Sequence, residues 1–295
     1  MTKDLSGFIN ILKPPGMTSH DVIGFVRKVL HIKRVGHAGT LDPAAAGVLP
    51  VAVGQAARLI EYLELADKVY RAEIQLGIAT DSGDDTGAVI AELDDFKLPS
   101  KAQLETILAG FKGTIKQQPP AHSAIKINGK RACDLLRQGK AVTMPTRKVT
   151  IKELELLAIN QLHRTLLIDV ACSKGTYIRS LCRDIGEALK IPATMAFLVR
   201  QQVGDFSLAD TVTLEELADC GAQALLDPAK FLNHLERYDL ASAREKAFRN
   251  GLGTGERQHI PKSDILRVYV GDRFIGIGRY DRLKAEIVPV KVLGN

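Results

Sequence analysis

An α+β fold is predicted for this chain, because its sequence contains both strand and helix patterns. Residues 68–76 alternate between apolar and polar side chains, which is typical of a strand with one buried face. Residues 178–189 instead carry apolar side chains at the spacing of a helix. Gly271-Asp272 separates two short apolar runs and predicts a β-hairpin. With 295 residues, the chain is long enough for one large domain and a small one.

The first thirty residues predict a strand followed by a helix. Residues 8–12 form a short apolar run, and the rigid turn Lys13-Pro14-Pro15-Gly16 ends it. Thr18 and Asp21 then have the spacing of a capping box at the start of a helix. Apolar residues recur at helical spacing from 22 to 30 and give that helix one buried face.

The segment Gly36–Pro50, which reads GHAGTLDPAAAGVLP, has the features of a functional loop. Pro43 biases Asp42 away from the helical conformation. Residues 44–47 add almost no bulk, so a substrate can approach the Asp42 carboxylate closely. A lone Asp-Pro pair more often marks a turn or a helix cap. The functional interpretation of Asp42 therefore depends on the whole segment.

The next eighty residues predict a helix, a strand, an acidic turn and a second helix. The helix covers residues 56–65, and the strand at 68–76 carries Tyr70 on its apolar face. Tyr70 is then either a core residue or a ring at the edge of a pocket. The acidic residues 81–87 lack the ligand and glycine positions of an EF-hand loop, so a turn between two strands is favoured. Ser100 is a predicted helix cap.

Positive charge is concentrated between Lys112 and Lys152. This segment holds ten basic residues and one acidic residue, a net charge of +9, whereas the whole chain carries +6. Pro, Asn-Gly and Gly interrupt it, so it is not a simple helix. A charge run usually forms a solvated surface, but a cluster of this density is also suited to gripping phosphate.

A turn at Ser173–Thr176 leads into the helix predicted to run from Tyr177 to Leu189. Arg179 lies in the first turn of this helix and off its apolar stripe. The N-terminal end of a helix dipole is positive, so a cation there is favoured only when an anion pairs with it. That anion is either a functional carboxylate or an ordinary neighbour on the surface.

The last eighty residues predict two short helices and then a small β unit. Its length is under sixty residues. The predicted elements are helices at 213–219 and 228–235, a linker at 237–240, a helix at 241–250, and strands at 266–270, 273–278 and 287–293.

Several classes of protein are disfavoured by composition and motif. The N-terminus lacks the pattern of a signal peptide, and no apolar run approaches membrane-spanning length. The four cysteines have no C-x-x-C spacing, which favours reduced thiols in a cytoplasmic protein over a zinc site or disulfides. Lys174-Gly175-Thr176 lacks the upstream glycine of a P-loop. No cofactor or metal is therefore expected.

Five motifs together resemble one known family. They are G-H-x-G-x-L-D-P-x-A-x-G-x-L-P at 36–50, K-P-x-G at 13–16, K-x-Y-x-A at 68–72, P-x-x-S-A-x-K-x-x-G-K at 120–130, and S-K-G-T-Y-I-R at 173–179. In these motifs the chain resembles the bacterial tRNA pseudouridine-55 synthases, the TruB family.

The resemblance implies a fold and a domain arrangement. The expected fold is the mixed, mainly antiparallel sheet of the pseudouridine synthases, flanked by helices. Residues 1–238 would form the catalytic domain, and residues 112–152 an RNA-gripping thumb inserted in it. Residues 239–295 would form a small, barrel-like PUA domain, although that match rests mainly on position.

The same resemblance implies site residues and a substrate. Asp42 would be the catalytic nucleophile, paired with Arg179. Uridine 55 in the T-arm of tRNA would be isomerised after it flips out of its stack. The residues expected to contact the RNA are His37, which would hold the displaced strand, Tyr70, Tyr177 and Leu198 around the uridine, and Lys126 and Lys130 on the backbone.

Some positions depart from the family pattern, and rival functions remain. Cys133 replaces a usual tyrosine, while Val199 and Gln202 replace usual arginines. A guide-RNA-dependent synthase of the dyskerin type shares the catalytic motifs, but it would carry long basic tails. A tRNA-binding or folding protein without chemistry would not need Asp42, Tyr70 and Arg179 together. The expectation is a monomer in the cytoplasm, with no guide RNA, obligate protein partner or membrane.

Overall fold

A nine-stranded sheet forms the main body of the protein. The computed structural model describes residues 5–63, 66–123, 125–127, 129–140, 142–255 and 260–294. The sheet has the strand order β1-β3-β12-β4-β11-β10-β7, with β2 paired to β3 and β13 paired to β12. Its strands are β1 (Gly7–Lys13), β2 (Val35–His37), β3 (Ala46–Val53), β4 (Lys68–Leu76), β7 (Gly113–Gln117), β10 (Arg147–Asn160), β11 (Thr165–Cys172), β12 (Ala193–Val203) and β13 (Phe206–Ser207).

The predicted mixed, mainly antiparallel sheet is confirmed. Neighbouring strands run antiparallel everywhere in this sheet except between β3 and β12. That parallel pairing is short, with Val199 opposite Ala46 and Arg200 opposite Gly47. It joins the β1–β3 part of the sheet to the β12–β7 part.

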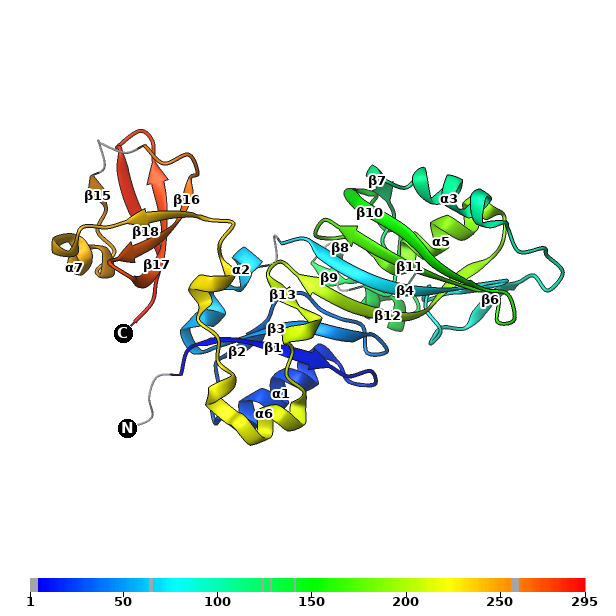
Figure 1. Cartoon of the computed structure of the whole chain (residues 1–295), viewed down its shortest axis with the longest axis horizontal. Helices are drawn as coiled ribbons and strands as arrows, with labels where there is room; N and C mark the ends of the chain where they lie inside the picture. The colour runs from blue at the N-terminus through cyan, green and yellow to red at the C-terminus, as the bar shows by residue number, and fades with distance from the viewer. Residues whose placement is uncertain are drawn as a thin grey trace.

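Each part of the sheet has its own helices and its own core. Helices α3 (Lys101–Ala109) and α5 (Ile178–Leu189) pack with β4, β10, β11 and β12 around one apolar cluster. Helices α1 (Ser19–Leu30) and α6 (Leu214–Cys220) pack with β1 and β3 around another. In Figure 1 the two helix pairs are well separated along the length of the sheet.

Helix starts follow the sequence where a local cap exists. The predicted capping box of Thr18 and Asp21 forms at α1, and Ser100 caps α3 as predicted. The predicted strand at 68–76 is β4. The acidic residues 81–87 do connect two strands, β5 (Ile78–Thr80) and β6 (Val89–Glu92).

Three predicted helices are shorter or tighter than expected. Residues 56–65 form a 3₁₀ turn, Gly54–Leu59, and one short helix, α2 (Ile60–Leu63), with Glu64 and Leu65 outside the described residues. Ala56 and Leu59 are both fully buried, and a 3₁₀ turn places residues three apart on the same side. The other two predicted helices become the 3₁₀ turns Pro228–Phe231 and Ser242–Arg244, the second followed by α7 (Glu245–Arg249).

The C-terminal residues form a separate five-stranded sheet with its own apolar core. Figure 1 shows it as a lobe at one end of the molecule. The predicted hairpin across Gly271-Asp272 is present, but the predicted linker at 237–240 is wrong, because β14 pairs in parallel with β16. The strands are β14 (Glu236–Asp239), β15 (Thr254–Gly255), β16 (Ile265–Val270), β17 (Arg273–Asp281) and β18 (Glu286–Val292).

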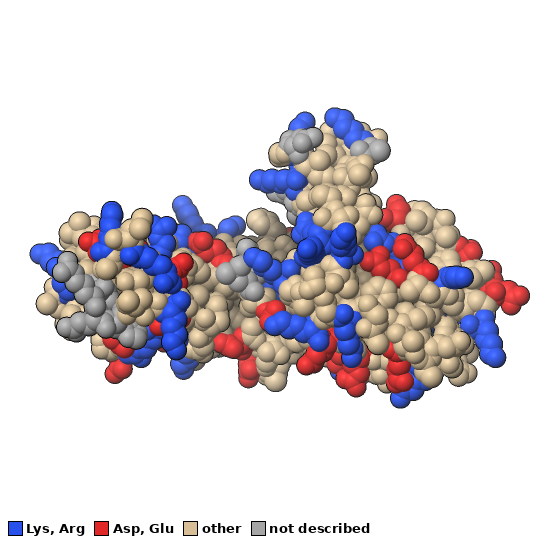
Figure 2. Space-filling model, turned by 90° about the horizontal axis from the view of Figure 1, so that it is seen from above, with Lys and Arg blue, Asp and Glu red and all other residues tan. Residues whose placement is uncertain are grey.

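The basic segment leaves the main sheet after β7 and returns in β10. Between them lie β8 (Lys126–Ile127), β9 (Lys130–Arg131) and the short helix α4 (Ala132–Arg137). Figure 2 shows a projection with several Lys and Arg side chains rising from the middle of the molecule. Within the part of the chain that the structure describes, no helix is long and apolar enough to cross a membrane.

Candidate active site

Asp42 lies in the loop between β2 and β3, and neighbouring elements fix this loop through its backbone. The Ser19 hydroxyl at the start of α1 accepts from the Leu41 N–H at 3.0 Å and donates to the Leu41 carbonyl at 3.2 Å. The Gly16 N–H donates to the Pro43 carbonyl at 2.9 Å. Backbone groups without a regular ladder need such partners when they are buried. The position of Asp42 is therefore set by contacts far from it in sequence.

Lys13 holds the C-terminal side of the loop. Its side chain is fully buried, and its ammonium donates to the carbonyls of Pro14, Pro43 and Ala45 at 2.8, 3.1 and 2.6 Å. These three bonds use all three of its N–H groups. Burial lowers the pKa of Lys13 to about 8, an effect that the nearby Asp42 carboxylate opposes.

Arg200 in β12 holds the other side of the loop. Its guanidinium is buried, and it donates to the carbonyls of Val48 at 2.8 Å, Gly39 at 2.9 Å and Thr40 at 3.5 Å. Burial lowers the pKa of Arg200, and the neighbouring Tyr70 side chain opposes this effect. Gly47 lies against the Arg200 backbone so closely that a Cβ there would overlap the Arg200 carbonyl group. Glycine is thus required at this point of the motif.

Arg179 forms the predicted ion pair with Asp42. From the first turn of α5, its Nε lies 3.0 Å from Asp42 Oδ2, and its Nη2 lies 3.2 Å from Asp42 Oδ1. The remaining N–H groups meet the Ser82 carbonyl at 3.0 Å, the His122 carbonyl at 3.0 Å and Asp84 Oδ2 at 3.4 Å. The Arg179 side chain is only 7% exposed, whereas that of Asp42 is 35% exposed. The carboxylate is held on one side and open on another.

The pKa of Asp42 is set by burial and by the charges of Arg179 and Asp84. Burial raises the pKa of Asp42, and this effect exceeds the opposing effect of the Arg179 guanidinium. The neighbouring Asp84 adds to the increase. Asp84 itself has a lowered pKa, because Thr86 and Ser82 donate hydrogen bonds to its carboxylate. Arg179 therefore limits the increase at Asp42 rather than reversing it.

Tyr70 and Leu198 lie in the same apolar cluster as the Asp42 loop. Tyr70 in β4 and Leu198 in β12 are both buried, and they share this cluster with Leu41 and Ala45 on either side of Asp42. Burial raises the pKa of the Tyr70 hydroxyl, so it is neutral at physiological pH. The structure thus brings Tyr70, Leu198 and Arg179 to one loop from three different elements.

His37 and Tyr177 lie at the ends of elements that lead into this site. His37 ends β2, and its Nδ1 is buried without a hydrogen-bond partner. Burial and the Arg200 charge lower the pKa of His37, which favours a neutral imidazole. Tyr177 is the N-cap residue of α5, and the Arg147 guanidinium lies 5.7 Å from the centre of its ring. Lys126 and Lys130 are exposed on β8 and β9.

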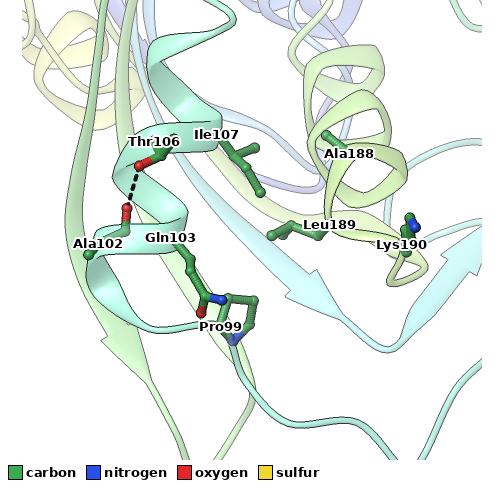
Figure 3. Close-up of a pocket in the computed structure, with 8 residues that line it drawn as sticks. All are labelled: Pro99, Ala102, Gln103, Thr106, Ile107, Ala188, Leu189 and Lys190. Atoms are coloured by element: carbon green, nitrogen blue, oxygen red, sulfur yellow. Dashed lines mark hydrogen bonds between the residues drawn. The ribbon is translucent and has the colours of Figure 1, made fainter.

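The two pockets of 550 and 410 Å³ lie elsewhere. Figure 3 shows the larger one between α3 and the end of α5, where Ile107 and Leu189 point toward each other. None of the residues described above around Asp42 lines either pocket. Among the described residues, no group of three or more His, Cys, Asp or Glu is arranged to hold a metal ion.

A protein-family model matches the part of the chain that contains the Asp42 loop. The model of the TruB family pseudouridylate synthase N-terminal domain matches residues 27–178, which is more than half of the chain. The chain belongs to the TruB family. The model of the tRNA pseudouridylate synthase B C-terminal domain matches residues 179–236.

Curated TruB relatives are similar over most of the chain. A tRNA pseudouridine synthase B of Clostridioides difficile is 41% identical over 293 residues, covering 94% of this chain and 95% of the relative. That of Symbiobacterium thermophilum is 46% identical, with coverage of 86% and 85%. That of Moorella thermoacetica is 49% identical, with coverage of 78% and 77%.

Solved structures show that this TruB chain has the pseudouridine synthase fold. A Cbf5-Nop10-Gar1 complex contains a chain with a TM-score of 0.74 and 26% identity, covering 98% of this chain and 84% of that one. An H/ACA RNP bound to a substrate RNA containing 2′-deoxyuridine gives a TM-score of 0.73 and 25% identity, with coverage of 97% and 84%.

Sequence reasoning missed two charged residues that the structure places beside the Asp42 loop and Arg179. Arg200, in the first case, donates to carbonyls on either side of Asp42. Asp84 was read only as part of an acidic turn, although it lies against Arg179. A charged residue that directly follows apolar residues, as in Leu198-Val199-Arg200, is the available signal for a buried cation. No comparable signal marks Asp84, because Asp is common in turns.

Proposed function

We propose that the protein is a tRNA pseudouridine synthase that isomerises uridine 55 in the T-arm of tRNA. Relatives that carry the name tRNA pseudouridine synthase B match most of the chain at 41–49% identity. One structural observation carries the proposal. Asp42 is held by the side-on guanidinium of Arg179 on a rigid loop, while one side of its carboxylate stays accessible.

The proposed reaction rearranges bonds within one nucleotide. The N1–C1′ bond of uridine breaks, the base turns, a C5–C1′ bond forms, and the proton on C5 moves to solvent while N1 gains one. Asp42 acts as the nucleophile and needs to be ionised. Because burial raises the Asp42 pKa, the Arg179 charge is what keeps the ionised form populated.

The uridine must leave its stack to reach Asp42. Extrusion of a base costs a few kcal/mol. Tyr70 and Leu198 supply apolar surface beside the Asp42 loop for the extruded base, and Tyr177 lies on the same α5 start as Arg179. His37, a partly exposed residue at the end of β2, is proposed to contact the displaced RNA.

Two further parts are proposed to bind the rest of the tRNA. The basic segment 112–152 acts as a thumb that contacts phosphates, including through Lys126 and Lys130. Residues 239–295 act as a PUA-like RNA-binding domain beside a catalytic domain of residues 1–238, although β14 spans this boundary. The protein is proposed to work as a monomer in the cytoplasm, without a guide RNA.

A guide-RNA-dependent synthase is the second candidate. It is favoured by the structural likeness to chains of Cbf5 and H/ACA complexes. The identity to those chains is 25–26%, whereas it is 41–49% to the curated relatives named above. Pseudouridine formed in a protein-free tRNA transcript, with no other RNA added, supports the first candidate. Turnover that requires an added guide supports the second.

Replacing the Asp42 carboxylate tests the mechanism. Asp42→Asn keeps the shape of the side chain and removes its charge, so turnover should fall below detection. tRNA binding should change little, because phosphate contacts elsewhere dominate the affinity. The measurements are single-turnover tritium release from C5-labelled uridine in tRNA and filter binding. Measurable turnover in a folded variant would rule out Asp42 as the nucleophile, and loss of binding together with turnover would indicate a structural role.

A further inference from the structure

Helix α5, which carries Arg179, lacks the local cap that other helices of this protein have. Helices α1, α3 and α6 each begin with a capping box, in which the N3 side chain accepts from the N-cap backbone N–H. The N-cap residue of α5 is Tyr177, which makes no side-chain cap. Ser180 at N3 instead donates to the Gln118 carbonyl at 2.7 Å. The start of this helix therefore depends on partners from outside it.

Gln117, the last residue of β7, supplies the missing cap. Its Oε1 accepts from the Tyr177 N–H at 2.8 Å, and its Nε2 donates to the Tyr177 carbonyl at 3.0 Å. The Gln117 side chain is fully buried. The Gln117 amide thus bonds to both backbone groups of Tyr177, the N-cap residue of α5, from sixty positions away in the sequence.

The same stretch of chain also contacts Arg179 directly. The His122 carbonyl accepts from Arg179 Nη2 at 3.0 Å, and the Gln118 carbonyl accepts from Ser180. Tyr177, Arg179 and Ser180 are therefore all bonded to residues 117–122. This stretch follows β7 at the point where the basic segment leaves the main sheet, so that point and the start of α5 form one hydrogen-bonded unit.

We propose that Gln117 is a positioning residue for the reaction, acting on Arg179 through the Tyr177 backbone. The proposal rests on the pseudouridine synthase function proposed above. Arg179 lies two residues after Tyr177, and its bonds to Asp42 need the guanidinium plane in one orientation. Without the Gln117 amide, the Tyr177 N–H loses its partner and the Tyr177 carbonyl keeps only its bond from the Leu181 N–H, so the first turn of α5 is held less firmly. A displacement of about 1 Å at such a site can cost on the order of 100-fold in rate.

A variant that removes only the amide tests this role. Gln117→Met keeps the length of the side chain and loses both hydrogen bonds. The full-length variant should show a single-turnover rate constant on tRNA transcript at least tenfold below the unmodified protein, with tRNA affinity within threefold. The matched control is Gln75→Met, because Gln75 also donates to backbone carbonyls but lies away from Asp42. A folded Gln117→Met protein with a rate within twofold of the unmodified one would overturn the proposal.

A second variant keeps the proposal testable if Gln117→Met does not fold. In Gln117→Glu, the protonated carboxyl reproduces both bonds, whereas the ionised form faces the Tyr177 carbonyl and cannot donate. The charged groups around this point are the cations Arg147 on β10 and Arg179 and Arg183 on α5. The rate relative to the unmodified protein should rise as pH falls from 8.5 to about 5. A ratio that stays constant over this range would contradict a positioning role.

The proposed function and this inference fail in different ways. If the unmodified protein forms no pseudouridine in tRNA, the proposed function fails and the variants are not compared. If the unmodified protein is active and Gln117→Met is equally active, only the positioning role fails.

Discussion

At the scale of single residues, two buried cations, Lys13 and Arg200, fix the Asp42 loop from opposite sides. Among the residues that the structure describes, neither forms an ion pair with a carboxylate, and each donates to backbone carbonyls of the loop or its flanks. A buried charge is costly unless its hydrogen bonds are satisfied. Here the carbonyls satisfy the cations, and the cations satisfy carbonyls that have no strand partner. These hydrogen bonds satisfy the cations and the loop carbonyls at the same time, and the loop is rigid for that reason.

Removing Arg200 should therefore destabilise the whole domain. Arg200→Met leaves the buried Val48 carbonyl and the partly buried Gly39 carbonyl without this donor, at about 1–3 kcal/mol for an unsatisfied buried group. We expect the free energy of unfolding, measured by urea denaturation, to fall by about 3–5 kcal/mol. Arg71→Met is the control, since Arg71 is half exposed and pairs with Asp169 at the surface. That variant should lose less than about 1 kcal/mol. Equal losses would show that the Arg200 contacts contribute little.

At this scale the sequence predicted the ion pair of Asp42 with Arg179, but not the residues that position it. The pairing of Arg179 with Asp42 followed from the family motifs, and the structure confirms it. The raised pKa of Asp42 did not follow, because the degree of burial depends on α5 and on the β5–β6 turn. The contacts of Arg200 were also beyond the sequence, since its partners lie about 150 to 160 positions away.

At the scale of elements, local signals worked where an element satisfies itself. The capping boxes of α1 and α3 and the alternation of β4 are properties of consecutive residues. The central strand β12 was not predicted. Its pairing with β4 shifts register twice, between Met195 and Phe197 and between Arg200 and Gln202, so its side chains do not alternate regularly.

The basic segment gives a prediction at the same scale. Lys126 and Lys130 lie on β8 and β9 with exposed side chains. Lys126→Ala with Lys130→Ala should weaken tRNA binding and reduce the slope of log K against log salt concentration by about 1.5 units. The control is Lys97→Ala with Lys101→Ala. These residues lie before and after Ser100, the N-cap of α3, and their replacement makes the same change in net charge. An unchanged slope in the first pair, or equal slopes in both, would show that β8 and β9 do not contact phosphate.

For the whole molecule, the C-terminal lobe is both independent and attached. It has its own core, yet Leu293 and Ile277 pack in a cluster with Phe8 and Leu59 of the main body. Arg58 also donates to the Val292 carbonyl at 2.7 Å. The sequence predicted the β character of this lobe, but it did not predict these attachments, because they join residues more than 200 positions apart.

Removing the lobe tests its role in binding. A chain ending at Leu235 removes β14 together with its partner β16, whereas a cut after Leu240 would leave β14 unpaired. We expect the shorter chain to fold with a lower melting temperature, because the Phe8 cluster becomes exposed, and to keep its single-turnover rate at saturating tRNA. Its tRNA dissociation constant should rise at least tenfold. An unfolded product would mean that the main body cannot stand alone, and an unchanged affinity would remove the lobe from tRNA binding.

The short parallel pairing of β3 with β12 has a mechanical consequence. Between these two strands only two residue pairs are formed, directly after the Asp42 loop, and one apolar cluster, with Val48 of β3 and Val203 of β12, packs across them. Under tension applied across the strands, we expect the sheet to part along this line first. The Arg200 guanidinium crosses it to reach Val48 and Gly39. Asp42 therefore lies beside the pairing that we expect to part first, and the Arg200 side chain is one of the groups that hold this pairing together.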